Sequence, residues 1–276
     1  MGNMAPMLLC LALMAGCATV EKYDTAPTAQ GRTQGYLPSK QLPDMIALLP
    51  PPPATGSTAF ALDQETSHAS FPLRDSARWA LAIQDADLSF PAAAESFSCA
   101  LNARITEQDT PRLFRLLRRT LADAGNAVSR PKDTYKRPRP FMVNGERICT
   151  PDYEQRLRTS GSYPSGHTTA GWTWALILSE IAPEQADAIL VRGRAYGQSR
   201  IVCNVHWQSD VNEGRTVAAA VVARLHADPA FRADVEAART ELAAARAKGL
   251  LPVRDCRTEA EALALPPAAA PQPSGN

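Results

Sequence analysis

The segment from Thr168 to Ile181 constrains the fold more than any other part of the chain, because it is apolar nearly all the way round a helix. A helix without a polar face must be covered on every side by other parts of the protein. The sequence therefore predicts a central buried helix with further helices packed around it. No stretch reaches 18 uninterrupted apolar residues, so we expect no helix of the mature chain to span a membrane.

The segments around this one show helical periodicity and little of the alternation that is typical of strands. Thr110 followed by Pro111 indicates a helix start, and the apolar stripe after it predicts a helix that Gly125 interrupts or ends. Asp75 is the expected cap of an earlier helix. Later helices are expected to start at Pro183, near Val211 and at Asp228-Pro229. The predicted fold is all-α, a single-domain helical bundle.

Composition excludes two classes of protein. The chain has 276 residues, of which 45% are hydrophobic, so it is too apolar to be disordered throughout. Its 29 Lys and Arg nearly balance its 28 Asp and Glu, and a net charge of +1 lacks the basic excess of a nucleic-acid binder. We therefore expect one domain with a proper core and no nucleic-acid partner.

The N-terminus has the pattern of an export signal. Residues 7–16 form a short apolar run that ends in small residues before Cys17, as in a secretory signal. Residues 14–17 resemble a bacterial lipobox, although no Lys or Arg precedes the run and Met14 stands where Leu is usual. We predict a signal peptide over residues 1–16, lipidation of Cys17 as the mature N-terminus, and a periplasmic or outer-membrane-anchored location. The alternative, a buried N-terminal helix, lacks a cap.

The distribution of prolines divides the rest of the chain. The 23 prolines gather near both ends, and the run Pro50–Pro53 favours extended polyproline II geometry. We predict a linker over residues 17–35, a main domain over 36–250 and a loose tail over 251–276. In an exported chain disulfides are permitted, and Cys203 is either part of one or a packed thiol. Three full pairings are possible among Cys99, Cys149, Cys203 and Cys256.

A basic motif contains Lys132 and Arg139-Pro140. Six cations and two acids fall between Arg130 and Arg147, in a chain that is otherwise neutral. Local positive charge suits an anionic ligand. Taken alone, such a run is more often a solvated basic loop.

A second motif runs from Gly161 to Thr168, where a loop meets the predicted buried helix. Unpaired backbone N–H groups at a helix N-terminus attract anions. Gly166 permits close approach of the backbone, and the Ser165 hydroxyl can donate a hydrogen bond. His167 is expected to stand at the rim of this anion site.

A third motif contains Arg200, His206 and Asp210. His206 and Asp210 are four residues apart, so we expect them on one helix face. Asp210 can then accept the Nδ1 hydrogen of His206, which leaves Nε2 free and more nucleophilic. Taken alone, this pair could be an ordinary surface contact.

Together the three motifs resemble the signature of the superfamily that contains type 2 phosphatidic acid phosphatases and vanadium haloperoxidases. The signature is Lys, six residues, Arg-Pro; then Pro-Ser-Gly-His; then Ser-Arg, five residues, His, three residues, Asp. The longer segment Gly161–Thr168 is similar to the class A bacterial non-specific acid phosphatases, as are stretches within residues 36–53 and 197–211. The resemblance covers residues 36–248 and departs from the signature at no position.

The resemblance implies an acid phosphatase domain over residues 36–250, with the helical bundle of the acid phosphatase and vanadium-dependent haloperoxidase type. It implies a broad-specificity acid phosphatase that hydrolyses phosphate monoesters such as nucleotides, sugar phosphates and aryl phosphates. Phosphotransfer is an expected side activity, and a homo-oligomer is the expected assembly. We expect no metal and no other cofactor, since the sequence contains no cluster of ligand residues at useful spacing.

The resemblance also implies a role for each motif residue. His206 attacks phosphorus and forms a phosphohistidine, Asp210 orients it, and His167 acts as the acid and then the base. The phosphate-binding residues are Lys132, Arg139, Ser165, Gly166 and Arg200. Outside the phosphate-binding residues, the walls of the pocket set substrate preference, and the candidates for them are Tyr135, Phe141, Tyr163 and Trp172.

Three other functions fit parts of the pattern. A vanadate-dependent haloperoxidase would bind vanadate at His206. A lipid phosphatase of the same superfamily would normally have several membrane spans. A phosphate-binding lipoprotein without activity would not need the His206–Asp210 pair together with His167.

Overall fold

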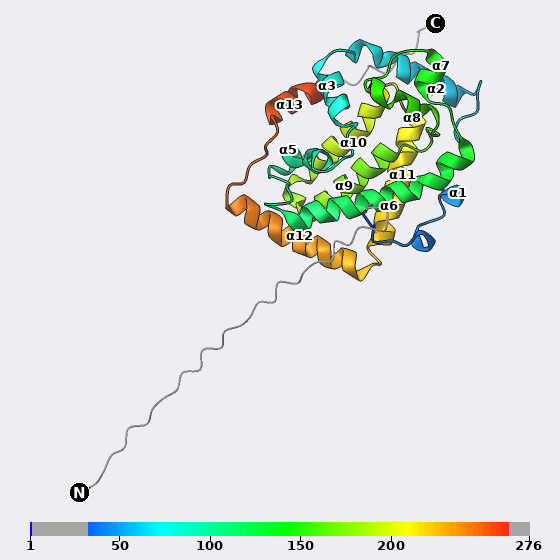
Figure 1. Cartoon of the computed structure of the whole chain (residues 1–276). Coiled ribbons are helices and arrows are strands. Elements are labelled where there is room, and N and C mark those ends of the chain that lie inside the picture. The colour runs from blue at the N-terminus through cyan, green and yellow to red at the C-terminus, as the bar shows by residue number, and fades with distance from the viewer. Residues whose placement is uncertain (2–32, 265–276) are drawn as a thin grey trace.

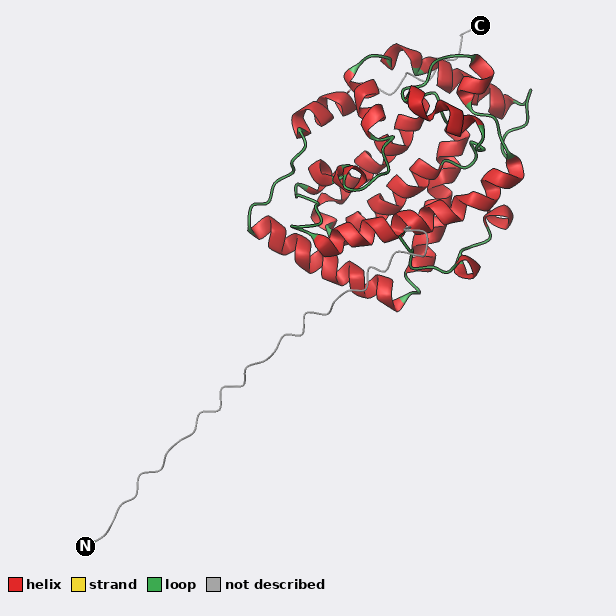
Figure 2. Cartoon of the chain, viewed as in Figure 1, coloured by secondary structure: helices red, strands yellow, loops and turns green. Residues whose placement is uncertain are grey.

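Helices make up all the regular structure of the residues that the computed structural model describes, which are residue 1 and residues 33–264. These residues contain no strand (Figure 2), so the all-α prediction is confirmed. The α-helices are α1 (Met45–Leu48), α2 (Thr58–Ala69), α3 (Ala77–Gln84), α4 (Ala92–Glu95), α5 (Ser98–Leu101), α6 (Pro111–Tyr135), α7 (Pro140–Asn144), α8 (Glu154–Arg158), α9 (Gly166–Ile181), α10 (Ala186–Val202), α11 (Gln208–Leu225), α12 (Pro229–Ala247) and α13 (Cys256–Ala264). Short 3-10 helices cover Ser39–Gln41, Phe71–Leu73, Pro151–Tyr153 and Pro183–Gln185.

The apolar helix α9 lies at the centre of the bundle, as its sequence predicts (Figure 1). It packs mainly against α10 and α11, and α6 covers a further side. Trp174 is fully buried, and its indole nitrogen donates to the carbonyl of Leu117 in α6 at 3.0 Å. Gly171 allows the close approach of α10, because a Cβ there would lie 2.3 Å from the ring of Tyr196. This contact fixes the position of the C-terminal end of α10 next to the start of α9.

Helix α6 is longer than its sequence pattern predicts. Gly125 does not end it, and the helix continues through Pro131 to Tyr135, where Lys136 closes it in the left-handed conformation with a φ of 45°. Buried residues recur along its whole length, so packing on one face outweighs the weak helix propensity of Gly125. The additional turns carry Lys132 to the site that is described below.

The chain packs on the bundle from residue 35 onward. The carboxylate of Asp123 in α6 accepts hydrogen bonds from the backbone nitrogens of Tyr36 and Leu37, each at 2.9 Å. Burial raises the pKa of Asp123 to about 6, although the two N–H donors stabilise the ionised carboxylate and act to lower the pKa. Further along, the Tyr163 hydroxyl donates to the carbonyl of Pro50 at 2.6 Å. The proline run thus lies against the loop before α9.

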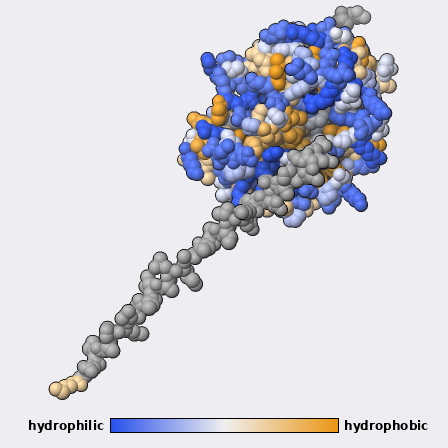
Figure 3. Space-filling view, viewed as in Figure 1, coloured by the Kyte–Doolittle hydropathy of each residue, from blue (hydrophilic) through white to orange (hydrophobic). Residues whose placement is uncertain are grey.

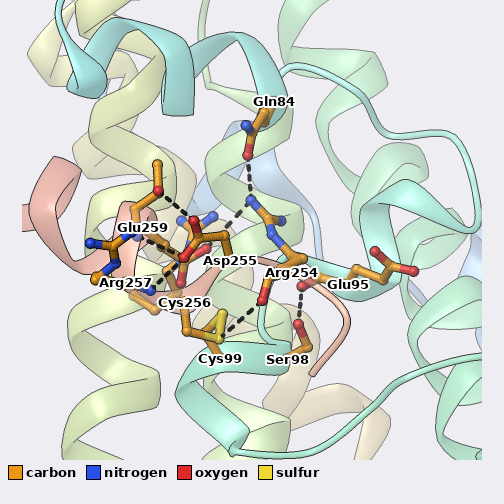
Figure 4. Close-up of a disulfide and its surroundings, with 11 residues drawn as sticks. Gln84, Glu95, Ser98, Cys99, Arg254, Asp255, Cys256, Arg257 and Glu259 are labelled. Carbon is orange, nitrogen blue, oxygen red and sulfur yellow. Dashed lines mark hydrogen bonds and ion pairs between the residues drawn. A yellow bond between two sulfur atoms is a disulfide. The ribbon is translucent and has the colours of Figure 1, made fainter. Parts of the chain in front are cut away.

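The prediction of a loose tail from residue 251 is wrong for residues 251–264. This segment forms α13 and is held by a disulfide between Cys99 and Cys256 (Figure 4). Arg254 donates to the side chain of Gln84 at 2.6 Å and lies 3.4 Å from Glu259. Glu259 also lies 3.4 Å from the buried Arg192. The composition of this short Ala- and Glu-rich segment does not indicate that a disulfide attaches it to the bundle.

The second disulfide joins Cys149 to Cys203, so of the two alternatives for Cys203 the structure has the disulfide. Asp75 is not a helix cap, since Ser76 caps α3 by accepting from the backbone nitrogen of Trp79. The 3-10 helix at Pro183 precedes α10, which starts three residues later than expected.

The predicted signal peptide, Cys17, most of the linker and residues 265–276 lie outside the described residues. None of the helices that are described is long and apolar enough to cross a bilayer. The face shown in Figure 3 is mostly hydrophilic, with apolar side chains in scattered patches.

Candidate active site

A cavity of about 470 Å³ brings the three sequence motifs together. Its lining includes most of the predicted site residues, namely Lys132, Arg139, Gly166, His167, Arg200 and His206. Ser165 and Asp210 do not line the cavity, because both are fully buried directly behind it.

The candidate wall residues Tyr135, Phe141, Tyr163 and Trp172 do not line the cavity either. That prediction is wrong, because these side chains pack into the bundle or against its loops. The observed walls are Ala86, Asp87, Leu88, Ser89, Tyr153, Arg156, Leu157 and Ser160.

Lys132 reaches the cavity from the last turn of α6. Its ammonium donates to the carbonyl oxygens of Gly161 at 2.8 Å and Ser162 at 3.3 Å. Gly161 permits this close approach, since a Cβ there would lie 2.5 Å from the Lys132 carbonyl oxygen. Burial, followed by the nearby charge of Arg139, lowers the pKa of Lys132 to about 7.

Arg139 is held rigidly by backbone carbonyls. Its Nε donates to Leu157 at 3.0 Å and to Ser160 at 3.1 Å, and its Nη1 donates to Val205 at 3.0 Å. The side chain is buried, and burial lowers its pKa to about 10. These contacts fix the orientation of the planar guanidinium group. Its positive charge has no carboxylate partner among the described residues.

Arg200 lies in the last turn of α10 and is only 1% exposed. Its Nε has no hydrogen-bond partner among the described residues, and its Nη1 donates to the sulfur of Cys203 at 3.8 Å. Burial lowers its pKa to about 10. A buried guanidinium with unused donors is costly unless an anion binds it.

The start of α9 forms the floor of the cavity. Ser165 caps the helix by accepting from the backbone nitrogen of Thr168, and its own nitrogen donates to the carbonyl of Asp210 at 3.0 Å. The hydroxyls of Ser165 and Thr168 are 2.9 Å apart. Gly166 then lies in the first turn and lines the cavity, so unpaired backbone N–H groups are available there.

His167 follows directly and is held by a residue that the sequence motifs do not contain. Its Nε2 lies 3.0 Å from the carbonyl oxygen of Ala86, which follows α3. A carbonyl only accepts, so Nε2 carries the hydrogen and Nδ1 is the nitrogen that can exchange a proton. Burial, and next the charge of Arg200, hold the pKa of His167 well below its usual range.

His206 and Asp210 meet, but they do not share a helix face as expected. Helix α11 starts at Gln208 with Trp207 as its N-cap, so His206 precedes the helix. Asp210 lies in the first turn, where its Oδ2 accepts from the Trp207 nitrogen at 2.9 Å and lies 3.2 Å from His206 Nδ1. The four-residue spacing still brings the two side chains together, because a carboxylate in the first turn of a helix reaches back over the residues that precede the helix.

The tautomer of His206 follows from its neighbours. Arg139 Nη1 lies 3.1 Å from His206 Nε2, and a guanidinium only donates. Nε2 therefore accepts, and the hydrogen is on Nδ1, where Asp210 receives it. Burial, and then the charges of Arg139 and Lys132, keep the pKa of His206 well below its usual range. The ring is thus neutral, and its Nε2, which lies at the cavity, holds its electron pair in the hydrogen bond from Arg139.

Among the described residues, no group of three or more His, Cys, Asp or Glu side chains could hold a metal ion. The cavity instead gathers four cations (Lys132, Arg139, Arg156 and Arg200), the carboxylate of Asp87, two neutral imidazoles and a helix N-terminus. This set of groups suits a dianion of the size of phosphate.

Comparison with known proteins agrees with this site. A model of the family described as "PAP2 superfamily" matches residues 117–233, which include every predicted site residue beyond Cys17. A non-specific acid phosphatase of Providencia stuartii is 45% identical over 75% of this chain and 84% of its own length. An acid phosphatase of Zymomonas mobilis is 43% identical over 76% and 79%, respectively. A non-specific acid phosphatase of Salmonella typhimurium is 40% identical over 81% and 88%.

The helical fold and the clustered motifs therefore define a phosphatase of the PAP2 superfamily. Within it, the chain belongs to the non-specific acid phosphatases, with which it shares 40% to 45% of its residues over most of its length.

The unusual pKa of Lys132 leads to a prediction about anion binding. Sulfate keeps its two charges between pH 6 and pH 9, so it reports the charge of the protein alone. A Lys pKa of about 7 means that the ammonium loses its proton above pH 7. The inhibition constant of sulfate should therefore rise by up to about tenfold per pH unit above pH 7.

The Lys132→Gln variant should bind sulfate weakly and with a flat profile across pH 7. Lys136→Gln, at an exposed neighbouring residue, should behave as the wild type does. A wild-type inhibition constant that stays level from pH 6.5 to pH 8.5 would contradict the lowered pKa.

Proposed function

We propose that this chain hydrolyses a broad range of phosphate monoesters through a phosphohistidine at His206, without a metal ion. The observation that carries the proposal is a group of three cations at the cavity, the buried Arg139 and Arg200 and the half-buried Lys132, which have no carboxylate partner among the described residues. Burying unpaired charge costs several kcal/mol per ion in a folded protein. A phosphate dianion provides the missing counter-charge.

In this proposal the cations bind the three non-bridging oxygens of the phosphoryl group. The guanidinium groups of Arg139 and Arg200 bind oxygens through paired N–H donors, and Lys132 leaves its carbonyl partners for the ligand. The N–H of Gly166, which lines the cavity, adds a further hydrogen bond, whereas the Ser165 hydroxyl lies behind the cavity and caps α9. Donors that are already in place stabilise the charge that spreads over these oxygens in the transition state.

His206 is the proposed nucleophile. Its Nε2 electron pair attacks phosphorus opposite the leaving oxygen, so that an N–P bond forms as the P–O bond breaks. The positive charge that develops on the ring is stabilised by Asp210, which receives the Nδ1 hydrogen. Because the pKa of His206 is lowered, the ring stays neutral and reactive in acidic solution.

His167 is the proposed acid for the first step and base for the second. Protonated at Nδ1, it gives a proton to the leaving alkoxide, and the neutral ring then takes a proton from the water that cleaves the N–P bond. The pKa of His167 in the free protein lies below its usual value near ~6.5. Protonation therefore requires acidic solution, and kcat/KM falls as the pH rises through this pKa.

The size of the cavity supports a broad substrate range. About 470 Å³ exceeds the need of a phosphate group, and its outer wall mixes apolar Leu88 and Leu157 with polar Asp87, Ser89 and Arg156. Nucleotides, sugar phosphates and aryl phosphates are the proposed substrates. The homo-oligomer stays a prediction from the family resemblance.

Replacing the nucleophile tests the mechanism directly. With a phosphate-labelled substrate, rapid acid quench of the wild type in the presence of EDTA should trap one labelled, acid-labile phosphoryl group per site. His206→Ala should trap none and should lower hydrolysis by at least roughly a thousandfold. The trapped group should pass to an added alcohol as well as to water, which measures phosphotransfer. Normal labelling of His206→Ala would refute the assignment, and loss of wild-type labelling in EDTA would refute metal independence.

Replacing the acid should separate two kinds of substrate. His167→Ala should lower kcat/KM for alkyl phosphates by roughly a hundredfold or more, because their alkoxide leaving groups need a proton. The loss for p-nitrophenyl phosphate should be much smaller, because its leaving group is stable as an anion. His68→Ala, at an exposed histidine outside the cavity, is the control. Equal losses on both substrates would exclude His167 as the acid.

We also propose that the chain is exported and anchored by a lipid on Cys17, on the strength of the apolar run and lipobox in its sequence. Bacteria that express the full chain should incorporate labelled palmitate into it and hold it in the membrane fraction. Cys17→Ser should lose both properties, while Cys10→Ser should keep them. Palmitate labelling that survives Cys17→Ser would refute the anchor.

A further inference from the structure

A buried chain of charges runs behind the nucleophile and extends beyond the three motifs. Arg137 is 6% exposed and lies between two carboxylates, with Nη2 2.7 Å from Asp63 Oδ2 and Nη1 2.5 Å from Asp210 Oδ1. Asp63 is 3% exposed and belongs to α2, which precedes the part of the chain that matches the superfamily. The order of the groups is thus Asp63, Arg137, Asp210 and His206.

Ser209 adds hydrogen bonds to this chain of charges. It links Asp63 and Arg137, since its nitrogen and hydroxyl both donate to Asp63, at 2.8 and 2.5 Å, and its hydroxyl also accepts from Arg137 Nη1 at 2.7 Å. The guanidinium carbon of Arg137 lies 5.5 Å from the ring centre of Trp207, which gives it a stacked apolar neighbour. A buried hydrogen-bond network of this kind holds its members in one geometry.

The two oxygens of Asp210 have separate tasks. Oδ2 faces His206 and the Trp207 nitrogen, whereas Oδ1 faces Arg137. Asp210 is fully buried, and burial raises its pKa while Arg137 opposes the rise most strongly. Lys132 and Arg139 in the cavity are further charged neighbours, and both favour the ionised carboxyl. Arg137 itself does not line the cavity, so it is not in a position to bind the phosphate.

We propose that Arg137 and Asp63 are positioning residues, which hold the Asp210 carboxylate against His206 and so prepare Nε2 for attack. Arg137 supplies the counter-charge for Asp210, and Asp63 fixes the second half of the guanidinium so that the first half points at Oδ1. The inference rests on the proposed function of His206 as nucleophile. It adds a residue from α2 to a site that the three motifs alone do not complete.

Loss of Arg137 should make the enzyme sensitive to acid. Without the guanidinium, the buried Asp210 takes up a proton at a higher pH than in the wild type and no longer accepts the Nδ1 hydrogen. Arg137→Gln should therefore lower kcat roughly 10- to 100-fold, the usual effect of removing a group that orients a reactive residue. The loss should be largest at acidic pH, so that the optimum moves toward neutral pH.

Two further measurements separate positioning from binding and from folding. The sulfate inhibition constant of Arg137→Gln should stay within about threefold of the wild type near pH 7, because the phosphate cradle is intact. Arg137→Lys should recover part of kcat and of the acid limb, since it restores the charge without the fork. Asp63→Asn, a milder change that keeps the shape of the side chain, should move the pH profile in the same direction by a smaller amount. Arg130→Gln and Glu65→Gln are exposed controls on α6 and α2, and both should match the wild type.

An unchanged pH profile in both Arg137→Gln and Asp63→Asn would overturn the inference, as would parallel loss of kcat and of sulfate binding. If Arg137→Gln fails to fold, Asp63→Asn decides by its pH profile. Failure of the proposed function would look different, because His206→Ala would then still form the labelled phosphoprotein.

Discussion

Three cations lie around one cavity without a carboxylate among the described residues to neutralise them, and the rest of the structure serves to keep them there. Lys132 and Arg200 come from the last turns of two long helices, and Arg139 precedes a third, short one. Repulsion and desolvation act against this arrangement, as the lowered pKa values of all three cations indicate. The apolar helix α9, buried against α6, α10 and α11, gives the fold the rigidity that such a site requires.

Most of the acidic side chains nearby are bonded elsewhere, and Asp87 lies in the outer wall of the cavity. Asp210 is placed behind His206 and bonded to Arg137, and Asp63 is bonded to the same arginine. Asp85 is buried against Arg192 and Ser199. The carboxylates thus hold the frame of the site, while the cavity itself keeps an excess of positive charge. This separation allows tight binding of a dianion in a chain whose net charge is only +1.

The sequence predicts most of the residues that gather at the cavity, because the spacing within each motif follows from contacts within one turn or one loop. The approach of Asp210 to His206 is a local contact of this kind, even though His206 is not helical. The central position of helix α9 is predictable because a helix that is apolar on every side is stable only where other helices cover it completely. The sequence does not predict the continuation of α6 past Gly125, since tertiary packing outweighs local propensity there.

Contacts between distant segments escape sequence reasoning altogether. Nothing in the spacing signals that Ala86 would hold His167, that Asp63 would reach Arg137, or that Cys256 would bring back the C-terminal segment. Each depends on how two separate helices come together in space. The choice of aromatic residues as walls of the substrate pocket is wrong for the same reason. Those residues pack into the bundle, and the cavity is lined instead by residues from the segments 86–89 and 153–160.

The disulfide between Cys149 and Cys203 makes the structure around the cavity depend on the redox state of the compartment. Cys149 follows the segment of Arg139, and Cys203 lies in the turn between Arg200 and His206, so one covalent bond ties together the chain segments that bear two of the cations and His206. Hydrogen bonds join the same segments, among them the one from Arg139 to the Val205 carbonyl at 3.0 Å and the one from Asn204 to the Glu146 carbonyl at 3.0 Å. The disulfide adds a bond that an oxidising compartment preserves and a reducing one breaks, so the stability of this half of the cavity depends on the redox state around the protein.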